Sequence, residues 1–293
     1  MTLRHLKIFK EVCDHGSITK AAEALFIAQP SVSVAISELE KHYNVTLFQR
    51  ISNRLIITEE GKSVYERACN VLNAFDDFES TAYNGDIPKI KIGTSLTVGT
   101  YILPDLMCQI KKLFPQVQVS VKIFQTKIIE DHVAKGELDI GLIESSTSLP
   151  VLQAEKFSED ELVVVCSQNF PAPDNISKNE IASYPFILRE QGSASRDLFD
   201  MYLKQNDIHF TPSVETVIPQ AAIELAKLGL GIAVLPFGMV KELISSKVLK
   251  RINLEGAKFE RSYFIIAHRQ RNLSALQKQI YDLCLNYKNF SEQ

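Results

Sequence analysis

The segment from residue 17 to residue 50 contains two helical patterns joined by a tight turn, and it constrains the fold more than any other part of the chain. The first helix begins after Ser17, a good N-cap residue, and keeps helical apolar spacing as far as Leu25. Pro30 then stands at the start of a second helix, where a proline is tolerated. The apolar stripe of this second helix is Val32, Ile36, Leu39 and Tyr43. This order predicts a helix-turn-helix packed on a core.

The face of the second helix opposite that stripe carries mostly short side chains. They are Pro30, Ser31, Val34, Ser37, Glu38 and Lys41, flanked by Gln29 and Ser33. A helix in the major groove of DNA needs short polar groups and amides near its N-terminal end, and the apolar Val34 suits contact with a thymine methyl. The alternative is an amphipathic helical pair with no role in nucleic-acid binding.

A β-hairpin is predicted directly after the second helix. The segment LFQRISNRLIIT has apolar residues on both sides of Ser52 and Asn53, which puts Arg50, Asn53 and Arg54 at or near the hairpin tip. A basic hairpin beside a recognition helix is typical of a winged helix that contacts phosphates. Residues 1 to 58 contain seven Lys and Arg against five Asp and Glu, whereas the whole chain has a net charge of −3. DNA binding is therefore predicted from the placement of the charges and not from their sum.

Several linked motifs in this first part resemble the N-terminal domain of LysR-type transcriptional regulators. LKIF, GSITKAAEAL, AQPSVSVAISELE, LFQR and ITEEG follow one another in the family's order between residues 6 and 61. Two residues depart from the family pattern: Val34 replaces a basic or amide residue, and Asn44 replaces a frequent glycine, although Asn tolerates a left-handed turn. Pattern and resemblance together predict DNA contacts at Thr19, Gln29, Pro30, Ser31, Ser33, Val34, Ser37, Arg50, Asn53 and Arg54.

One long helix is predicted from Thr58 to about Asn84. Its apolar residues alternate at intervals of four and three: Val64, Ala68, Val71, Phe75, Phe78 and Ala82. Such a heptad seam indicates helix-on-helix packing. In the resembled family this linker helix pairs antiparallel with that of a second subunit, so these six residues are the predicted dimerisation contacts. The alternative is a helix that packs on its own domain. Asn84 to Pro88 then mark a boundary.

The rest of the chain alternates short β-rich runs with amphipathic helices. The candidate strands are KIKIGTS, QVSVKIFQ, LDIGLIE, ELVVVCSQ, PFILRE, IAVLP and SYFIIAH. They favour α/β folding with largely parallel sheets, and two crossover regions are predicted, at Phe157–Leu162 and Phe264–Arg269. IKIGTS, GELDIGLIE, EQGSASRDLF and LAKLGLGIAVLP resemble the LysR effector domain, whose two lobes are similar to periplasmic solute-binding proteins.

This resemblance predicts an effector site in the cleft between the lobes. Hydroxyl-bearing and helix-opening residues follow the strands, an arrangement that suits an anionic ligand at helix N-termini. They are Ser95, Thr97, Thr126, Ser146, Thr147, Ser193, Ser195, Pro219 and Gln220. Each one could instead be only a helix cap. Arg196 could neutralise a ligand, although pairing with a nearby acid is favoured. Because those loops contain few aromatic residues, a small anionic or polar effector is predicted.

Cofactors, metals and membrane segments are not predicted. The five cysteines are scattered without CxxC spacing, which favours free buried thiols in a reducing compartment over a redox pair. The six histidines show no metal-ligand spacing. No apolar stretch reaches the length of a membrane span, and the N-terminus lacks a signal-peptide core, so a cytoplasmic location is expected.

The sequence predicts a multidomain α+β transcription factor: a winged helix-turn-helix (1–58), a linker helix and hinge (59–88), and a two-lobed α/β effector domain (89–293). Lobe I is expected at 89–160 and 268–293, and lobe II at 161–267. The expected partners are an operator DNA, a small effector and further copies of the chain in a homodimer and homotetramer. Two alternatives stay open. One is a constitutive DNA-binding protein with a C-terminal assembly module; the other is an enzyme, for which no catalytic motif stands out.

Overall fold

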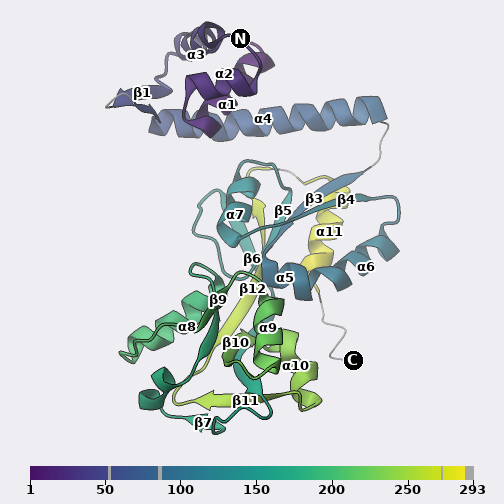
Figure 1. Cartoon of the computed structure of the whole chain (residues 1–293). Coiled ribbons are helices and arrows are strands. Elements are labelled where there is room, and N and C mark those ends of the chain that lie inside the picture. Colours follow the sequence, from purple (N-terminus) through teal and green to yellow (C-terminus); the bar gives the residue numbers. More distant parts are fainter. Residues whose placement is uncertain (52–53, 85–87, 272, 288–293) are drawn as a thin grey trace. The chain divides into compact units, whose positions relative to one another are not determined.

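The computed structural model describes residues 1–51, 54–84, 88–271 and 273–287. The chain divides into an N-terminal unit, Met1–Pro88, and an α/β unit that comprises Lys89–Val133 and the residues from Leu138 onward (Figure 1). Each unit has its own apolar core. None of the described helices is both long enough and apolar enough to cross a membrane.

The N-terminal unit is a winged helix-turn-helix followed by a long helix. Its elements are α1 (Leu3–His15), α2 (Ile18–Ala24), α3 (Gln29–Tyr43), β1 (Phe48–Ile51), β2 (Arg54–Ile57) and α4 (Glu59–Asn84). Ser17 caps α2 as predicted, since its hydroxyl accepts a hydrogen bond from the backbone N–H of Lys20. β1 and β2 pair antiparallel and form the predicted hairpin. The core is built around the fully buried Phe9, whose ring meets those of Phe48 and Tyr65 edge to face.

The turns that frame α3 use left-handed backbone at two positions without glycine. Asn44 has φ 52° and ψ 47° at the end of α3, as its replacement of a glycine predicts, and its N–H donates to the carbonyl of Glu40. Phe26, in the turn before α3, has φ 54° and a side chain almost fully exposed. Tyr43, predicted to belong to the apolar stripe, is about half exposed because it lies in the last turn of α3.

The first half of α4 packs against its own unit. Ala68, Cys69 and Leu72 are buried in the core that α1 and α3 share. Ala68, 3% exposed, was predicted to contact a second subunit and is instead covered by its own domain, and Val64 packs against the same core. The sequence could not separate the two uses of this helix because both require apolar residues at the same spacing.

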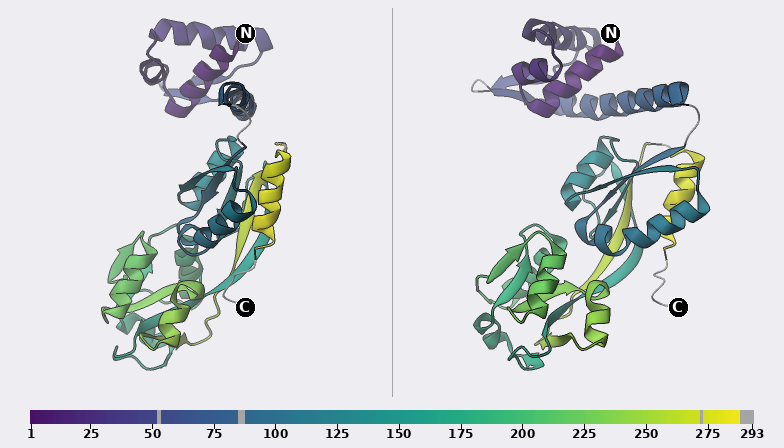
Figure 2. Two further views of the ribbon diagram at one scale, coloured as in Figure 1. Left: turned by 90° about the vertical axis from the view of Figure 1, so that its right-hand side faces the viewer. Right: turned by 45° about the vertical axis from the view of Figure 1, so that its right-hand side comes forward.

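The α/β unit consists of two lobes built around shared strands (Figure 2). Lobe I contains β3 (Lys89–Thr94), α5 (Leu96–Tyr101), α6 (Leu103–Leu113), β4 (Gln118–Ile123), α7 (Thr126–Ala134), β5 (Ile140–Ile143) and α11 (Ala275–Leu285). Lobe II contains β7 (Asn175–Ile176), the 3₁₀ helix η1 (Lys178–Ser183), β8 (Phe186–Arg189), α8 (Ala194–Gln205), β9 (Val214–Thr216), α9 (Pro219–Lys227), β10 (Ile232–Pro236), α10 (Phe237–Ser245) and β11 (Leu249–Leu254). Two long strands, β6 (Leu152–Ser167) and β12 (Glu260–His268), belong to both lobes.

The sheets are mixed and not largely parallel. β3 pairs parallel with β4 and β5 in lobe I, and β8 pairs parallel with β9 and β10 in lobe II. The crossover strands add antiparallel pairs: β12 with β5 and β6, and β6 with β10 and β11. All seven predicted strands are present, whereas β7, β9, β11 and the first half of β6 were not predicted.

The two crossovers lie beside each other on β6 and β12. Residues Glu260–Tyr263 of β12 pair with Ser158–Glu161 of β6, within the first predicted crossover. The second crossover was predicted at Phe264–Arg269, which is wrong, because Phe264 already pairs with Ile143 in lobe I. Lobe I therefore resumes at Phe264, before the predicted residue 268. A β-bulge between Tyr263 and Phe264 marks this change.

The left-handed Asn44 generates a stability prediction. Asn44→Ala should lower the free energy of unfolding by about 1 kcal/mol, because an ordinary L-residue is disfavoured in this conformation. Asn44→Gly should leave it nearly unchanged, and the exposed, helical Lys41→Ala serves as the control. Urea denaturation followed by circular dichroism measures all three. Equal losses for the Ala and Gly variants would show that the backbone conformation is not the cause.

Candidate DNA-binding and effector sites

The face of α3 predicted to read DNA is open to solvent. Among the predicted contact residues, Thr19, Gln29, Pro30, Ser31, Val34, Ser37, Arg50 and Arg54 are exposed, and Ser33 is half-buried. Asn53 lies outside the described residues. Val34 is 55% exposed, so its apolar side chain is available for contact with a partner. The turn with the exposed Phe26 directly precedes α3 and was not singled out from the sequence.

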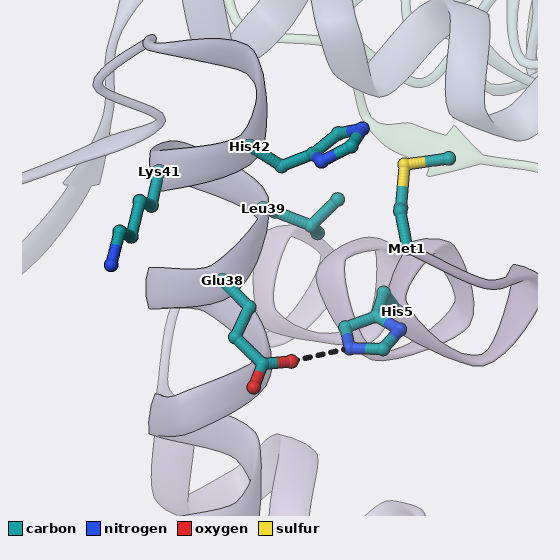
Figure 3. Close-up of a pocket in the computed structure, with 6 residues that line it drawn as sticks. All are labelled: Met1, His5, Glu38, Leu39, Lys41 and His42. Atoms are coloured by element: carbon teal, nitrogen blue, oxygen red, sulfur yellow. Dashed lines mark hydrogen bonds and ion pairs between the residues drawn. The ribbon is translucent and has the colours of Figure 1, made fainter.

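The C-terminal half of the exposed α3 face borders a surface pocket of about 500 Å³ (Figure 3). His5 of α1 points across it to Glu38 of α3, and their Nε2 and Oε2 atoms are 2.8 Å apart. The other ring nitrogen of His5, Nδ1, lies 2.9 Å from the hydroxyl of Thr2. The pair with His5 holds Glu38, the one acidic side chain predicted on the DNA-reading face, toward α1.

Beyond the core, α4 exposes an apolar stripe in its second half. Val71 is 47% exposed and Phe78 is 67% exposed, while Ala82 is also exposed. Phe75 is half-buried, with its ring 6.3 Å from that of Phe78 and the Lys7 ammonium 6.0 Å from its centroid. Four of the six predicted dimerisation residues are thus available to a partner helix, with Phe75 partly so.

In the α/β unit, buried polar groups gather around Arg261 of β12. We refer to Ser95, Glu144, Asp160, Ser195, Arg261 and Tyr263 as the Arg261 cluster. The guanidinium is 5% exposed, and its Nη1 lies 3.1 Å from Glu144 Oε2 and 3.1 Å from the hydroxyl of Ser195. Its Nη2 donates to the hydroxyl of Tyr263. One side chain thus contacts several elements at once.

The cluster contains two carboxylates for one guanidinium. Glu144 Oε1 accepts a hydrogen bond of 3.0 Å from the hydroxyl of Ser95, and Asp160 Oδ2 accepts one of 2.8 Å from Tyr263 and lies 3.4 Å from Arg261 Nε. The two acidic side chains are 8% and 7% exposed. Burial by itself lowers the pKa of Arg261, but Tyr263, Glu144 and Asp160 offset this and the pKa rises, so the guanidinium stays charged.

The Arg261 cluster joins the two lobes. Ser95 stands at the N-cap position of α5 and Glu144 follows β5, so both belong to lobe I. Ser195 lies in the first turn of α8 in lobe II, and Asp160 and Arg261 face each other as partners on the crossover strands. Two of the nine predicted effector residues, Ser95 and Ser195, are thus connected through Glu144 and Arg261.

The lobes also meet on α10, next to an inter-lobe pocket of about 380 Å³. Tyr101 of lobe I lies against Gly238 of lobe II so closely that a Cβ atom at Gly238 would be 2.3 Å from the ring. Asp160 and Tyr263 line the same pocket, and the backbone N–H of Gly238 donates to Asp160 over 3.4 Å. The pocket and the Arg261 cluster therefore share two side chains.

The contacts described for the other predicted effector residues are local, and none connects these residues to the Arg261 cluster. Ser193 caps α8, Thr147 accepts from the N–H of Leu149, and Gln220 pairs with Glu224. Thr126 is half-buried, Ser146 is exposed and Pro219 is buried at the start of α9. Thr97 is fully buried, and its hydroxyl has no hydrogen-bond partner among the described residues.

Arg196 belongs to lobe II alone. Its Nε lies 2.7 Å from Asp200, and its Nη1 lies 3.0 Å from Glu215 and donates to the carbonyl of Arg189. The favoured prediction, pairing with a nearby acid, is confirmed. Glu144, Asp160, Arg261 and Tyr263 were missed, and the available signal was the position of charged residues beside strands that are otherwise apolar.

All five cysteines are free thiols. Cys69, Cys166 and Cys284 are buried and Cys13 is half-buried, whereas Cys108 is exposed, contrary to the prediction that all are buried. Burial raises the pKa of Cys69 and of Cys166 to about 11, which disfavours reactive thiolates. Within the ranges that the structure describes, no group of three or more His, Cys, Asp or Glu could hold a metal ion.

Comparison with known proteins accounts for both units. The family model for bacterial regulatory helix-turn-helix proteins of the lysR family matches residues 3–62, and the model for the LysR substrate binding domain matches residues 84–288. The chain is 30% identical to the transcriptional regulator YeiE of Escherichia coli K12 over 97% of both chains. It is 32% identical to the regulator CysL of Bacillus subtilis over 88% of this chain and 89% of that one.

A solved structure has the same fold along nearly the whole chain. It is a full-length OxyR variant from Pseudomonas aeruginosa, with a TM-score of 0.65, 22% sequence identity, and coverage of 98% of this chain and 94% of that one.

The exposed stripe of α4 generates a prediction about assembly. Phe78→Asp should weaken self-association, because the burial of an aromatic side chain contributes about 1.5 to 3 kcal/mol at each of two symmetric positions. Asp76→Asn, on the opposite side of α4, is the matched control. Analytical ultracentrifugation of the full chain should find the Phe78 variant lighter than the control. An unchanged mass would refute the α4 interface.

Proposed function

The chain belongs to the LysR family of bacterial transcriptional regulators, and we propose how its two units divide the work. The N-terminal unit binds an operator through α3 and the β1–β2 hairpin. The α/β unit binds a small effector between its lobes. The observation that carries this proposal is the Arg261 cluster, which connects predicted effector residues of both lobes through one buried cation.

Recognition of DNA is divided between two classes of side chain. Arg50 and Arg54 on the hairpin contact phosphates, which position the protein but carry little sequence information. Ser33 and Val34 on α3 face base edges in the major groove. Val34 stands where related chains usually have a basic or amide residue. Its apolar side chain favours an operator with a thymine at the base that it contacts.

The chain acts as an oligomer. The exposed second half of α4 pairs with the same helix of a second copy, and a dimer reads two half-sites about one helical turn or a multiple apart. Two such dimers form a tetramer. The effector favours one arrangement of the lobes, and the assembly transmits that preference to the spacing and bending of the DNA. This function requires a cytoplasmic location and no enzymatic activity.

The effector is a small molecule with an oxyanion group. Arg261 supplies a charged donor, and Ser95 and Ser195 supply hydroxyl groups within the cluster. Thr97, two positions after Ser95, adds a buried hydroxyl that has no partner among the described residues. A constitutive regulator, whose second unit only assembles the protein, is the competing function. Stabilisation by a ligand separates the two.

Mutations on the two DNA-binding elements should have different effects. Arg54→Ala should weaken binding to all sequences and reduce the salt slope by about 1. Val34→Gln should change the base preference and cost roughly 1 to 3 kcal/mol at the cognate site. Lys112→Ala, an exposed change in the α/β unit, is the control. Fluorescence anisotropy across a salt series measures all variants, and DNA affinity without salt dependence in the full chain would contradict the proposal.

A thermal-shift screen of carboxylates, phosphates and sulfur oxyanions should find a stabiliser of the full chain. A ligand that binds only the folded state adds about 2.7 kcal/mol at a hundredfold excess over its Kd. Its affinity should fall about tenfold or more in Ser95→Ala, which removes a hydrogen bond to a charged group. Ser120→Ala, an exposed hydroxyl on β4, should have no effect. An effector indifferent to Ser95 would move the site elsewhere.

A further inference from the structure

We propose that Glu144 is an internal stand-in for the effector. In the ligand-free chain its carboxylate occupies the position between Ser95 and Arg261 into which the oxyanion group of the effector binds, and binding exchanges one for the other. This inference rests on the effector site proposed above, and it specifies the ligand chemistry and the side chain that competes with it.

The geometry of Glu144 is that of a bound carboxylate ligand. One oxygen accepts from the Ser95 hydroxyl at 3.0 Å and the other lies 3.1 Å from Arg261 Nη1, so each oxygen has its own donor. The same Nη1 also lies 3.1 Å from the Ser195 hydroxyl of lobe II. A carboxylate in this position therefore contacts lobe I directly through Ser95 and is connected to lobe II through Arg261.

The charges in the cluster make Glu144 the exchangeable acid. Asp160 is held independently of Glu144 by Tyr263 and lies 3.4 Å from Arg261 Nε, so the guanidinium keeps a counter-ion without Glu144. If an anion entered while Glu144 stayed, three negative groups would surround one buried cation, and their repulsion would oppose binding. Anion binding therefore requires Glu144 to leave.

The chain around Glu144 allows it to leave. Its side chain is 8% exposed, but it stands at the end of β5, directly before the exposed Ser145 and Ser146. A rotation of this side chain toward solvent leaves the strand pairing of Ile140–Ile143 intact.

A second observation that points to a ligand comes from α5, the helix that begins directly after Ser95. The Thr97 hydroxyl is fully buried and has no hydrogen-bond partner among the described residues, two positions after Ser95 in the first turn of α5. A buried polar group normally has a partner. Glu144 accepts a hydrogen bond from the Ser95 hydroxyl and leaves the Thr97 hydroxyl without a partner among the described residues. The ligand that fits best is therefore a small oxyanion with a third acceptor oxygen, beyond the two that a carboxylate presents to Ser95 and Arg261.

Chemical rescue tests the exchange, with acetate as the probe because it has the functional group of Glu144. Glu144→Ala in the full chain removes the internal carboxylate and leaves space for an external one. Thermal unfolding is measured in sodium acetate and in sodium chloride at equal ionic strength. The variant should unfold at a lower temperature than wild type in chloride and recover in acetate, at concentrations that leave wild type unchanged.

Two further variants make the test specific. Asp200→Ala removes an acid that pairs with the buried Arg196 in lobe II alone, and acetate should not rescue it. Glu144→Gln keeps the size of the side chain and removes its charge. Its midpoint for stabilisation by acetate should be at least about tenfold lower than that of wild type. This variant keeps the test decisive if the Ala variant does not fold.

Equal acetate responses of wild type, Glu144→Ala and Glu144→Gln would overturn the exchange. So would an effector from the screen whose affinity falls in Ser95→Ala but does not rise in Glu144→Gln; that result would leave the effector site itself in place. An effector indifferent to both Ser95 and Glu144 would instead contradict the proposed site.

Discussion

The ion pairs of Arg261 are the contacts on which the arrangement of the α/β unit depends. The guanidinium is buried between two acids and touches side chains from lobe I, lobe II and the crossover strands. Removal of one member of such a buried network leaves uncompensated charge, which typically costs about 3 to 5 kcal/mol. The bulge after Tyr263 lies next to this network, at the point where β12, still paired with β6, also begins to pair with β5 of lobe I. The bulge and the buried ion pairs therefore lie together on the crossover strands that join the two lobes.

A network of this kind suits a ligand-responsive protein because two acidic side chains share one guanidinium, so an added charge disturbs their pairing. A ligand that brings a further negative charge meets acids that are already paired with Arg261. The neighbouring pocket shares Asp160 and Tyr263 with the cluster and reaches the contact between Tyr101 and Gly238. Asp160 and Tyr263 therefore connect the ion pairs of Arg261 with the contact between Tyr101 and Gly238.

Local features of the fold were predictable from the sequence, and long-range ones were not. The cap at Ser17, the left-handed Asn44 and the seven apolar strands depend on neighbours in the chain, so their patterns are visible there. The first half of β6 was missed because its polar run, AEKFSEDE, lacks the alternation of a half-buried strand. Ala68 was assigned to a partner because its own core and a second helix require the same residue type.

In the candidate sites, too, local features were predictable from the sequence and long-range contacts were not. The exposed face of α3 follows from helical periodicity, which places Ser31 and Val34 opposite the buried Val32. The cluster around Arg261 does not, since Glu144 and Arg261 are 117 positions apart and no sequence pattern connects them. The hydroxyl groups of Ser95 and Ser195 suggest an anion site, but the contact of Ser95 with the Glu144 carboxylate follows only from the fold.

We expect this chain to read a specific DNA sequence as a symmetric assembly. The most direct test is to incubate the purified full chain with randomly fragmented DNA from its source, capture the complexes and sequence the bound fragments. We expect enrichment of one motif that contains an inverted repeat, with half-sites separated by about one helical turn or a multiple of it. Bound fragments with the same composition as the input, at a salt concentration that suppresses non-specific binding, would contradict it.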